Sequence, residues 1–331
     1  MRKLLLALAA LLIADAPAVL AQASAHQAAG RTAPSPLAPS EIVDQAPKSD
    51  WIAIPASDLL VMDLAPGPNA KPRRVVIQLM PPPFSQGWIG NIRKLAAAHW
   101  WDGLSVNRAQ DNYVVQWGDA DGDDRAKARA LPAGLASISE AHYVSPAVAS
   151  KLIRDPARGL LYSHGLIADQ DAYAITQFWQ GWPLGRSAEM GPKQQNWPIH
   201  CYGMVGVGRN LSPDTGTGAE LYTVIGHAPR HLDRNIALVG RVIEGIEHLS
   251  SLPRGTGALG FYETAAERTQ INSVRLGSTV PALPAYEYLS TESATFAKYA
   301  YARANRRDPF FITPAGGADI CNIPVPVRRA K

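Results

Sequence analysis

The sequence lacks features that would indicate nucleic acid or a lipid bilayer as a partner. Its 331 residues carry a formal net charge of only +4, so nothing indicates the concentrated basic face that nucleic-acid binding requires. The basic pairs at 306–307 and 328–329 are interpreted as solvated segments. No apolar run after about residue 21 is long enough to span a bilayer. We therefore expect no nucleic-acid partner and no stable membrane span in the mature chain.

Motifs for metal, nucleotide and hydrolytic chemistry are missing as well. The sequence has no His-Glu-x-x-His and no Gly-x-Ser-x-Gly, the patterns of zinc proteases and serine hydrolases. His227 and His231 are four residues apart, but Pro229 between them argues against a shared helical face. The glycine-rich segment 203–208 lacks the dinucleotide fingerprint and is interpreted as a loop where backbone approaches a ligand. We expect no metal and no cofactor.

The first 21 residues have the pattern of a signal peptide. A basic start, Met1-Arg2-Lys3, is followed by an apolar run over residues 4–20 and by small residues. The run is short for a membrane helix and contains Asp15. We therefore expect cleavage and export, which makes the mature protein periplasmic or secreted.

The composition predicts a flexible segment before the globular part. Residues 22–50 are rich in Ala, Pro and Ser and have few large apolar side chains, so a flexible linker is predicted there. The whole chain is 47% hydrophobic and 18% charged, the balance of an ordinary globular protein. Ordered structure is predicted to begin near Trp51.

Apolar patterning predicts mainly strands, with two longer helices. Strand patterns cover residues 74–79, 203–207, 221–225, 238–242 and 270–274. A helix capped by Ser85 is predicted after the three prolines, and its apolar face comprises Trp88, Ile89, Ile92, Leu95 and Ala96. A second helix is predicted over residues 291–307. Between residues 120 and 198 the pattern indicates short helical and loop pieces, with a helix starting at Ser145-Pro146.

The segment 103–119 carries the clearest sign of function. It predicts a strand with Arg108, a turn at Asp111-Asn112, and a returning strand on which Tyr113, Val114 and Gln116 line the same cleft. A guanidinium beside an apolar pocket suits a reaction in which an amide bond rotates and nothing is cleaved. Taken alone, Arg108 is more readily interpreted as a surface arginine on an antiparallel sheet, and the blocks of sequence that flank it reverse this preference.

Three blocks of sequence resemble those of one family. The first, from Arg108 to Gly118-Asp119, is similar to Phe-His-Arg-Val-Ile-x-x-Phe-Met-Ile-Gln-Gly-Gly-Asp. The second, residues 203–222, is similar to the region from Ser-Met-Ala-Asn-Ala to Gly-Ser-Gln-Phe-Phe-Ile. The third, residues 231–245, is similar to Trp-Leu-Asp-Gly through Phe-Gly-x-Val-x-x-Gly. Together they make the chain resemble the cyclophilin family of peptidyl-prolyl cis/trans isomerases.

The resemblance implies a fold and a set of domains. The expected fold is mainly β, a closed antiparallel eight-stranded barrel capped by helices. The barrel domain is assigned to residues 51–253, with a large mixed insert at about 120–198. Residues 254–331 are expected to form a C-terminal extension packed on the domain.

The resemblance also implies an activity and the residues that carry it. The expected function is prolyl isomerisation that assists the folding of exported proteins, with proline-containing polypeptides as partners. Arg108 and Gln116 take the catalytic positions. The substrate-binding positions are Tyr113, Val114, Val205, Gly206, Val207, Glu220, Tyr222 and Leu232.

Several positions depart from the family pattern. Gly206 replaces an asparagine, its flanking alanines become Val205 and Val207, and His231 replaces an aromatic residue. Glu220 replaces a glutamine and is expected to orient Arg108 by pairing with it, or to draw it away from the substrate. These changes leave open an alternative, a noncatalytic proline-peptide-binding or chaperone protein on the same scaffold. A third interpretation makes the insert and the tail the functional part.

The two cysteines, Cys201 and Cys321, are 120 residues apart. In an exported chain such a pair is expected to form a disulfide, which would tie the C-terminal tail to the core. Two unpaired buried thiols remain the alternative, because a bridge requires Cα atoms within roughly 7 Å.

Overall fold

The computed structural model describes residues 36–67, 70–146, 152–154, 161–163, 171–189 and 193–331. The chain divides into two units, Met1–Ser35 and Pro36–Lys331, and the described residues belong to the second. The predicted signal peptide and residues 22–35 of the predicted linker therefore lie outside the described residues.

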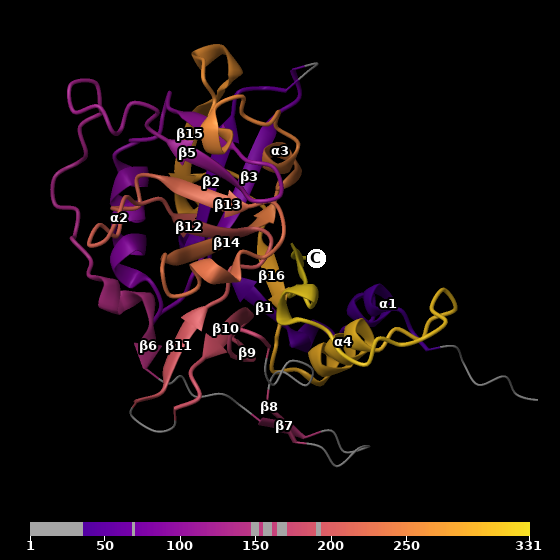
Figure 1. Cartoon of the computed structure of the whole chain (residues 1–331). Coiled ribbons are helices and arrows are strands. Elements are labelled where there is room, and N and C mark those ends of the chain that lie inside the picture. The colour runs from indigo at the N-terminus through magenta and orange to yellow at the C-terminus, as the bar shows by residue number, and fades with distance from the viewer. Residues whose placement is uncertain (1–35, 68–69, 147–151, 155–160, 164–170, 190–192) are drawn as a thin grey trace, which may run out of the picture. The chain divides into compact units, whose positions relative to one another are not determined.

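Eight antiparallel strands close into a barrel (Figure 1). Their order around the barrel is β12-β13-β5-β4-β15-β2-β3-β14, so strands that are distant in sequence become neighbours. Closure pairs both edges of every strand. This confirms the predicted eight-stranded barrel. The strands are β2 (Leu59–Leu64), β3 (Arg73–Leu79), β4 (Ser105–Ala109), β5 (Val114–Gly118), β12 (Met204–Val207), β13 (Leu221–Val224), β14 (Leu238–Glu244) and β15 (Thr269–Leu276).

Helix α2 (Gln86–Ala97) packs its apolar face into the core. The five residues predicted for that face, Trp88, Ile89, Ile92, Leu95 and Ala96, are all buried. The predicted cap is wrong, because Ser85 has a left-handed backbone with a φ of 55° and its side chain makes no capping hydrogen bond. The shorter helices are α1 (Pro39–Asp44), α3 (Glu247–Ser250) and α4 (Ala294–Ala304).

From Ser145 onward, the described part of the insert forms strands rather than the predicted helical pieces, whereas residues 120–144 hold turns, loops and a short 3-10 helix at Glu140–Tyr143. Its four strands are paired in the order β6-β11-β10-β9, and a separate hairpin pairs β7 with β8. Ser145-Pro146 begins no helix and instead forms β6, which pairs with β11. Phe178, Trp182 and Leu184 from this sheet join the same buried core as the barrel residues. The strands are β6 (Ser145–Pro146), β7 (Leu152–Arg154), β8 (Leu161–Ser163), β9 (Ile175–Trp179), β10 (Trp182–Arg186) and β11 (Gln195–Pro198).

The C-terminal region is divided between the barrel and a second sheet. The domain boundary at residue 253 is wrong, because β15 lies beyond it and pairs with β2 and β4 to close the barrel. A three-stranded sheet of β1 (Trp51–Ile54), β16 (Tyr286–Leu289) and β17 (Val327–Arg329) joins the start and the end of the described chain.

Residues 36–50 are folded and are not part of a flexible linker. They include helix α1, which contacts α4, and the apolar side chains of Ile42 and Val43 pack against the core. The sequence prediction failed because these few apolar side chains are enough to dock one short helix. A disulfide joins Cys201 to Cys321, with Cα atoms 5.1 Å apart, which confirms the predicted bridge from the tail to the core.

Candidate active site

Four adjacent strands place the predicted site residues in one row. Arg108 of β4 is paired with Gln116 of β5, Gln116 with Tyr222 of β13, and Tyr222 with Gly206 of β12. Residues directly opposite one another in antiparallel strands project from the same face of the sheet. Register therefore brings together four positions that span about a hundred residues of sequence.

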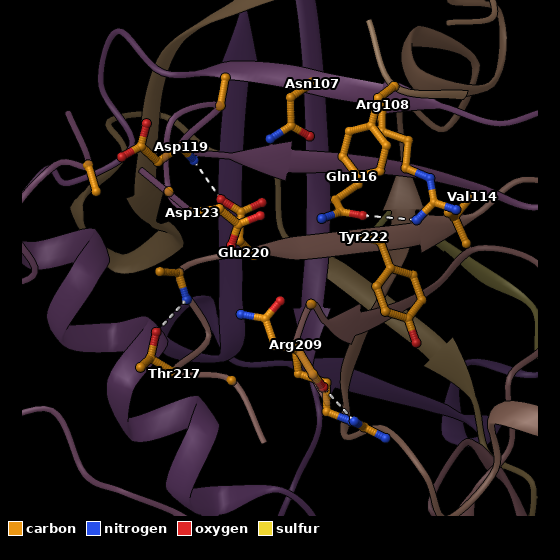
Figure 2. A pocket seen from close by; sticks show the side chains of 18 of the residues that line it. Asn107, Arg108, Val114, Gln116, Asp119, Asp123, Arg209, Thr217, Glu220 and Tyr222 are labelled. Carbon is orange, nitrogen blue, oxygen red and sulfur yellow. Dashed lines mark hydrogen bonds between the residues drawn. The ribbon is translucent and has the colours of Figure 1, made fainter. Parts of the chain in front are cut away.

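Three of the four residues in this row line a cleft of about 650 Å³. Arg108, Gln116 and Tyr222 contribute to its wall, together with Tyr113, Val114 and Leu232. Figure 2 shows Arg108, Gln116, Val114 and Tyr222 grouped at one end of the cleft, and Asp119, Glu220 and Thr217 toward the other. The cleft thus has an arginine beside an apolar end and a more polar second end.

Arg108 is held by three hydrogen bonds. Its Nε donates to the Leu259 carbonyl at 2.8 Å, one terminal nitrogen donates to Gln116 Oε1 at 3.2 Å, and the other donates to the Gln110 side chain. Its guanidinium also lies 5.1 Å from the ring centroid of Phe261 and 5.6 Å from that of Tyr113. A guanidinium has five N–H donors. These three bonds leave one N–H donor on each terminal nitrogen without a protein partner among the described residues.

The surroundings of Arg108 keep it ordered and partly dry. Burial lowers the pKa of Arg108, although a guanidinium remains charged at any physiological pH. Such a donor is planar, fixed in direction and incompletely hydrated. It can therefore interact strongly with the electron pair of an acceptor within hydrogen-bond distance.

The apolar end of the cleft is a separate cluster on the barrel surface. Val114, Tyr222 and Val224 are its buried members, with Tyr113, Leu232 and Ile236 packed against them. The turn that brings Tyr113 here uses Asn112 in a left-handed conformation with a φ of 50°. Tyr113 in turn stacks on His231, with ring centroids 6.3 Å apart and planes 12° apart. The four residues predicted to hold the proline ring, Tyr113, Val114, Tyr222 and Leu232, are thus brought together.

Glu220 lies at the polar end of the cleft and does not pair with Arg108 in the described structure. Its Oε1 accepts a hydrogen bond from the Asp119 N–H at 2.6 Å, whereas its buried Oε2 accepts no well-formed hydrogen bond from the described residues, although the Gln116 and Asn107 side chains lie near the carboxyl. Burial raises the pKa of Glu220 to about 7, against smaller opposing effects of the Asp119 N–H and of the Gln116 and Asn107 side chains. The expectation that Glu220 pairs with the arginine is therefore wrong, because Gln116 fills the position next to Arg108.

Metal ligands and membrane helices are both missing from the part of the chain that the structure describes. Within the described ranges, no three His, Cys, Asp or Glu side chains are grouped so that they could hold a metal ion. The helices in that part of the chain are all too short or too polar to cross a membrane.

Comparison with known proteins identifies the family. The family model described as "Cyclophilin type peptidyl-prolyl cis-trans isomerase/CLD" matches residues 88–276, more than half of the chain. The chain belongs to the cyclophilin family. No match is found among curated proteins.

A solved structure supports the fold of this cyclophilin. The cyclophilin AquaCyp293 from Hirschia baltica is similar with a TM-score of 0.60 and 19% identity, covering 85% of this chain and 94% of its own. A Cryptosporidium parvum cyclophilin type peptidyl-prolyl cis-trans isomerase, solved in the presence of the dipeptide Ala-Pro, has a TM-score of 0.37 and 11% identity. That match covers 66% of this chain and 98% of the other chain.

Two predicted substrate-binding side chains of this cyclophilin do not reach the cleft. Val205 and Val207 are each 0% exposed and belong to the barrel core. Successive residues of a strand point to opposite faces, so only Gly206 between them shares a face with Tyr222. Which of these side chains face the cleft depends on the register of the strand.

Sequence reasoning missed two residues beside the arginine. Phe261 and the Leu259 carbonyl lie close to the Arg108 guanidinium, in a segment that was assigned outside the barrel domain. Ile236 also lines the cleft, and its position four residues after Leu232 was a usable signal. Phe261 had no comparable signal, since it reaches Arg108 through one isolated bridge between distant segments.

Proposed function

We propose that this cyclophilin is an active peptidyl-prolyl cis/trans isomerase of exported polypeptides, with Arg108 stabilising the twisted prolyl amide. The observation that carries the proposal is the oriented guanidinium of Arg108 at the edge of the apolar cluster. The cluster would hold the proline ring, and the two remaining N–H donors of Arg108 would face the prolyl nitrogen.

The chemistry needs a donor of this kind. Rotation about an X-Pro bond destroys amide resonance and has a barrier of about 18–20 kcal/mol. In the twisted state the prolyl nitrogen recovers its lone pair and becomes a hydrogen-bond acceptor. A fixed donor at that nitrogen stabilises the transition state more than the ground state, which is what acceleration requires. Gln116 contributes by fixing one terminal nitrogen of the arginine.

Replacing the arginine tests the mechanism. Arg108→Ala is expected to lower kcat/KM for a proline peptide by about 100- to 1000-fold, the typical effect of one preorganised donor. Binding of the peptide is expected to weaken much less, because the apolar cluster remains. Arg307→Ala is the matched control, since Arg307 is exposed and does not line the cleft. Undiminished turnover in Arg108→Ala would remove the mechanism.

A second candidate function is a noncatalytic proline-peptide binder. It is favoured by the three hydrogen bonds that already engage Arg108 and by Gly206, which supplies no side chain to grip a peptide backbone. Saturable binding of a proline peptide by the wild-type protein, without any acceleration of its isomerisation, decides for this candidate.

We also propose export to the periplasm or the cell exterior. The basic start, the apolar run and the small residues up to residue 21 support it, as does the disulfide between Cys201 and Cys321. Expression of the full chain in a bacterium is expected to yield a periplasmic protein whose mass lacks about the first 21 residues. An intact mass in the cytosolic fraction would contradict export.

A further inference from the structure

A buried polar chain runs behind the apolar cluster and ends on Tyr222. His200 follows strand β11 of the insert and is 0% exposed. Its Nδ1 lies 2.9 Å from Asp233 Oδ1, and its Nε2 lies 2.9 Å from the Tyr222 hydroxyl. Since the carboxylate only accepts, Nδ1 donates to Asp233, and Nε2 shares a hydrogen bond with the Tyr222 hydroxyl. The phenol is therefore anchored by a hydrogen bond that water does not reach.

The far end of this chain fixes His200 itself. The Asp233 carboxylate also accepts from the His200 backbone N–H at 3.0 Å and from Arg230 Nε at 2.7 Å. Arg230 is 4% exposed and donates in addition to Asp171, a residue of the insert. The next residue after His200 is Cys201, which carries the disulfide. The insert thus helps to hold the histidine in place, and the disulfide joins the next residue to the C-terminal tail.

The anchored ring leaves no room for a side chain at position 206. A Cβ atom on Gly206 would lie 2.3 Å from both Cζ and the hydroxyl oxygen of Tyr222, well inside van der Waals contact. The family pattern has an asparagine where this chain has Gly206, and a phenylalanine where it has Tyr222. The tyrosine ring therefore occupies the space that a side chain at position 206 requires.

We propose that His200 is a positioning residue of the proline pocket, which holds Tyr222 over Gly206 and thereby makes Gly206 obligatory. The two departures from the family pattern are then one coupled change, and the insert acquires a role as the support of the pocket. The proposal rests on the proposed function only in taking this cluster as the site of the proline ring.

The consequence for a substrate follows from the missing side chain. The wall beside Tyr222 offers no amide to the peptide backbone at position 206, so binding depends on the apolar cluster, Arg108 and Gln116. The rigidity of the Tyr222 ring then decides how well the cluster fits a proline.

A set of Gly206→Ala measurements tests the coupling in four backgrounds. These are the wild type, Tyr222→Phe, His200→Asn and His200→Gln. An asparagine amide can replace Nδ1 toward Asp233 but does not reach Tyr222, whereas a glutamine amide reaches to the position of Nε2. In each background, the change in kcat/KM and in the thermal unfolding midpoint caused by Gly206→Ala is measured.

The penalty of Gly206→Ala is expected to be large where the ring is anchored and small where it is free. In the wild-type and His200→Gln backgrounds kcat/KM should fall about tenfold more than in the Tyr222→Phe and His200→Asn backgrounds, within the range of coupling found for contacting residues. The unfolding midpoint should show the same pattern. Equal penalties in all four backgrounds would overturn the proposal.

Two control variants and a measurement of unfolding midpoints without substrate complete the test. Gly90→Ala adds a Cβ that meets nothing within 4 Å, and Tyr299→Phe removes a hydroxyl that donates to the Pro324 carbonyl, away from the cleft. The penalty of Gly90→Ala should be the same in all four backgrounds, and Tyr299→Phe should leave the penalty of Gly206→Ala at its wild-type value. The midpoint shifts are measured without substrate, so they decide on the coupling even if the wild-type protein shows no isomerase activity, which would instead defeat the proposed function.

Discussion

The carboxyl of Glu220 occupies a position where the family has a neutral amide, and the protein raises its pKa to about 7 from the ordinary 4.5. Between about pH 4.5 and pH 7, the Glu220 carboxyl is therefore protonated in the folded state and ionised in the unfolded state. Stability from this group is fully present below about pH 4.5 and is lost as the pH rises through about 7. This pKa shift corresponds to a change of about 3 kcal/mol at most in the free energy of unfolding.

Glu220→Gln is expected to remove this pH dependence, because the glutamine is always neutral and still accepts from the Asp119 N–H. The measurement is the free energy of unfolding in urea for both proteins between about pH 5 and pH 8. The wild-type value should fall relative to the variant over that range. Parallel profiles would show that the carboxyl titrates at its ordinary value.

At the residue scale, sequence spacing predicted that Arg108, Tyr113, Val114 and Gln116 line one cleft, and all four do. They lie within one hairpin, where the distance along the chain nearly fixes the distance in space. Whether the side chains of Val205 and Val207 face the cleft or the core was not predictable, since a strand of small and apolar residues is compatible with either register. Glu220 was misjudged because its partner, the Asp119 N–H, is a backbone group that leaves no mark in the sequence.

At the element scale, the insert is joined to the barrel by a buried arginine without a carboxylate partner among the described residues. Arg241 of β14 donates to Gln78 at 2.8 and 2.9 Å and to the Gly181 carbonyl at 2.7 Å, and its guanidinium lies 4.5 Å from the ring centroid of Trp182. Burial lowers its pKa to about 10, so it remains charged at neutral pH. The strands of the insert are short and contain glycine and proline, which is why sequence patterning indicated loops and helices there.

Loss of this arginine should be far more costly than loss of an exposed one. Arg241→Ala leaves Gln78 and the Gly181 carbonyl buried without a donor and opens a cavity under Trp182, so we expect a loss of about 3 kcal/mol in unfolding free energy. Arg74→Ala is the comparison, because Arg74 pairs with Asp63 on the surface and should cost less than about 1 kcal/mol. Urea unfolding measures both, and equal losses would contradict a structural role of Arg241 between the insert and the barrel.

At the scale of the whole molecule, the barrel fold was predictable from the three sequence blocks that resemble the family, whereas the first and last residues of the barrel domain were not. Strands β2 and β15 complete the closed sheet from segments that lie before and after the recognised blocks, and they pair with each other across more than two hundred residues. Strand pairing of that range has no local signature in a single sequence. The disulfide was foreseeable only as a possibility, because the proximity of Cys201 and Cys321 depends on where the tail returns.

The bridge between Cys201 and Cys321 spans 120 residues, and a loop of that length makes its effect on the unfolded chain large. Closing it removes conformational entropy from the unfolded state, with a typical stabilisation of about 2–5 kcal/mol. Replacing both cysteines by alanine should lower the free energy of unfolding by that amount. Because the uncrosslinked chain exposes more surface when unfolded, the slope of that free energy against urea concentration should also increase.

Addition of a thiol reductant to the wild-type protein should reproduce both changes, and it should leave the double variant unaffected. A reductant effect on the variant would mean that the loss of stability has another cause. If removal of the bridge also lowers the penalty of Gly206→Ala, then the tail reaches the proline pocket through His200, which is the residue next to Cys201 in the sequence. If the penalty of Gly206→Ala does not change, then Asp233, Arg230 and Asp171 hold the histidine without help from the disulfide.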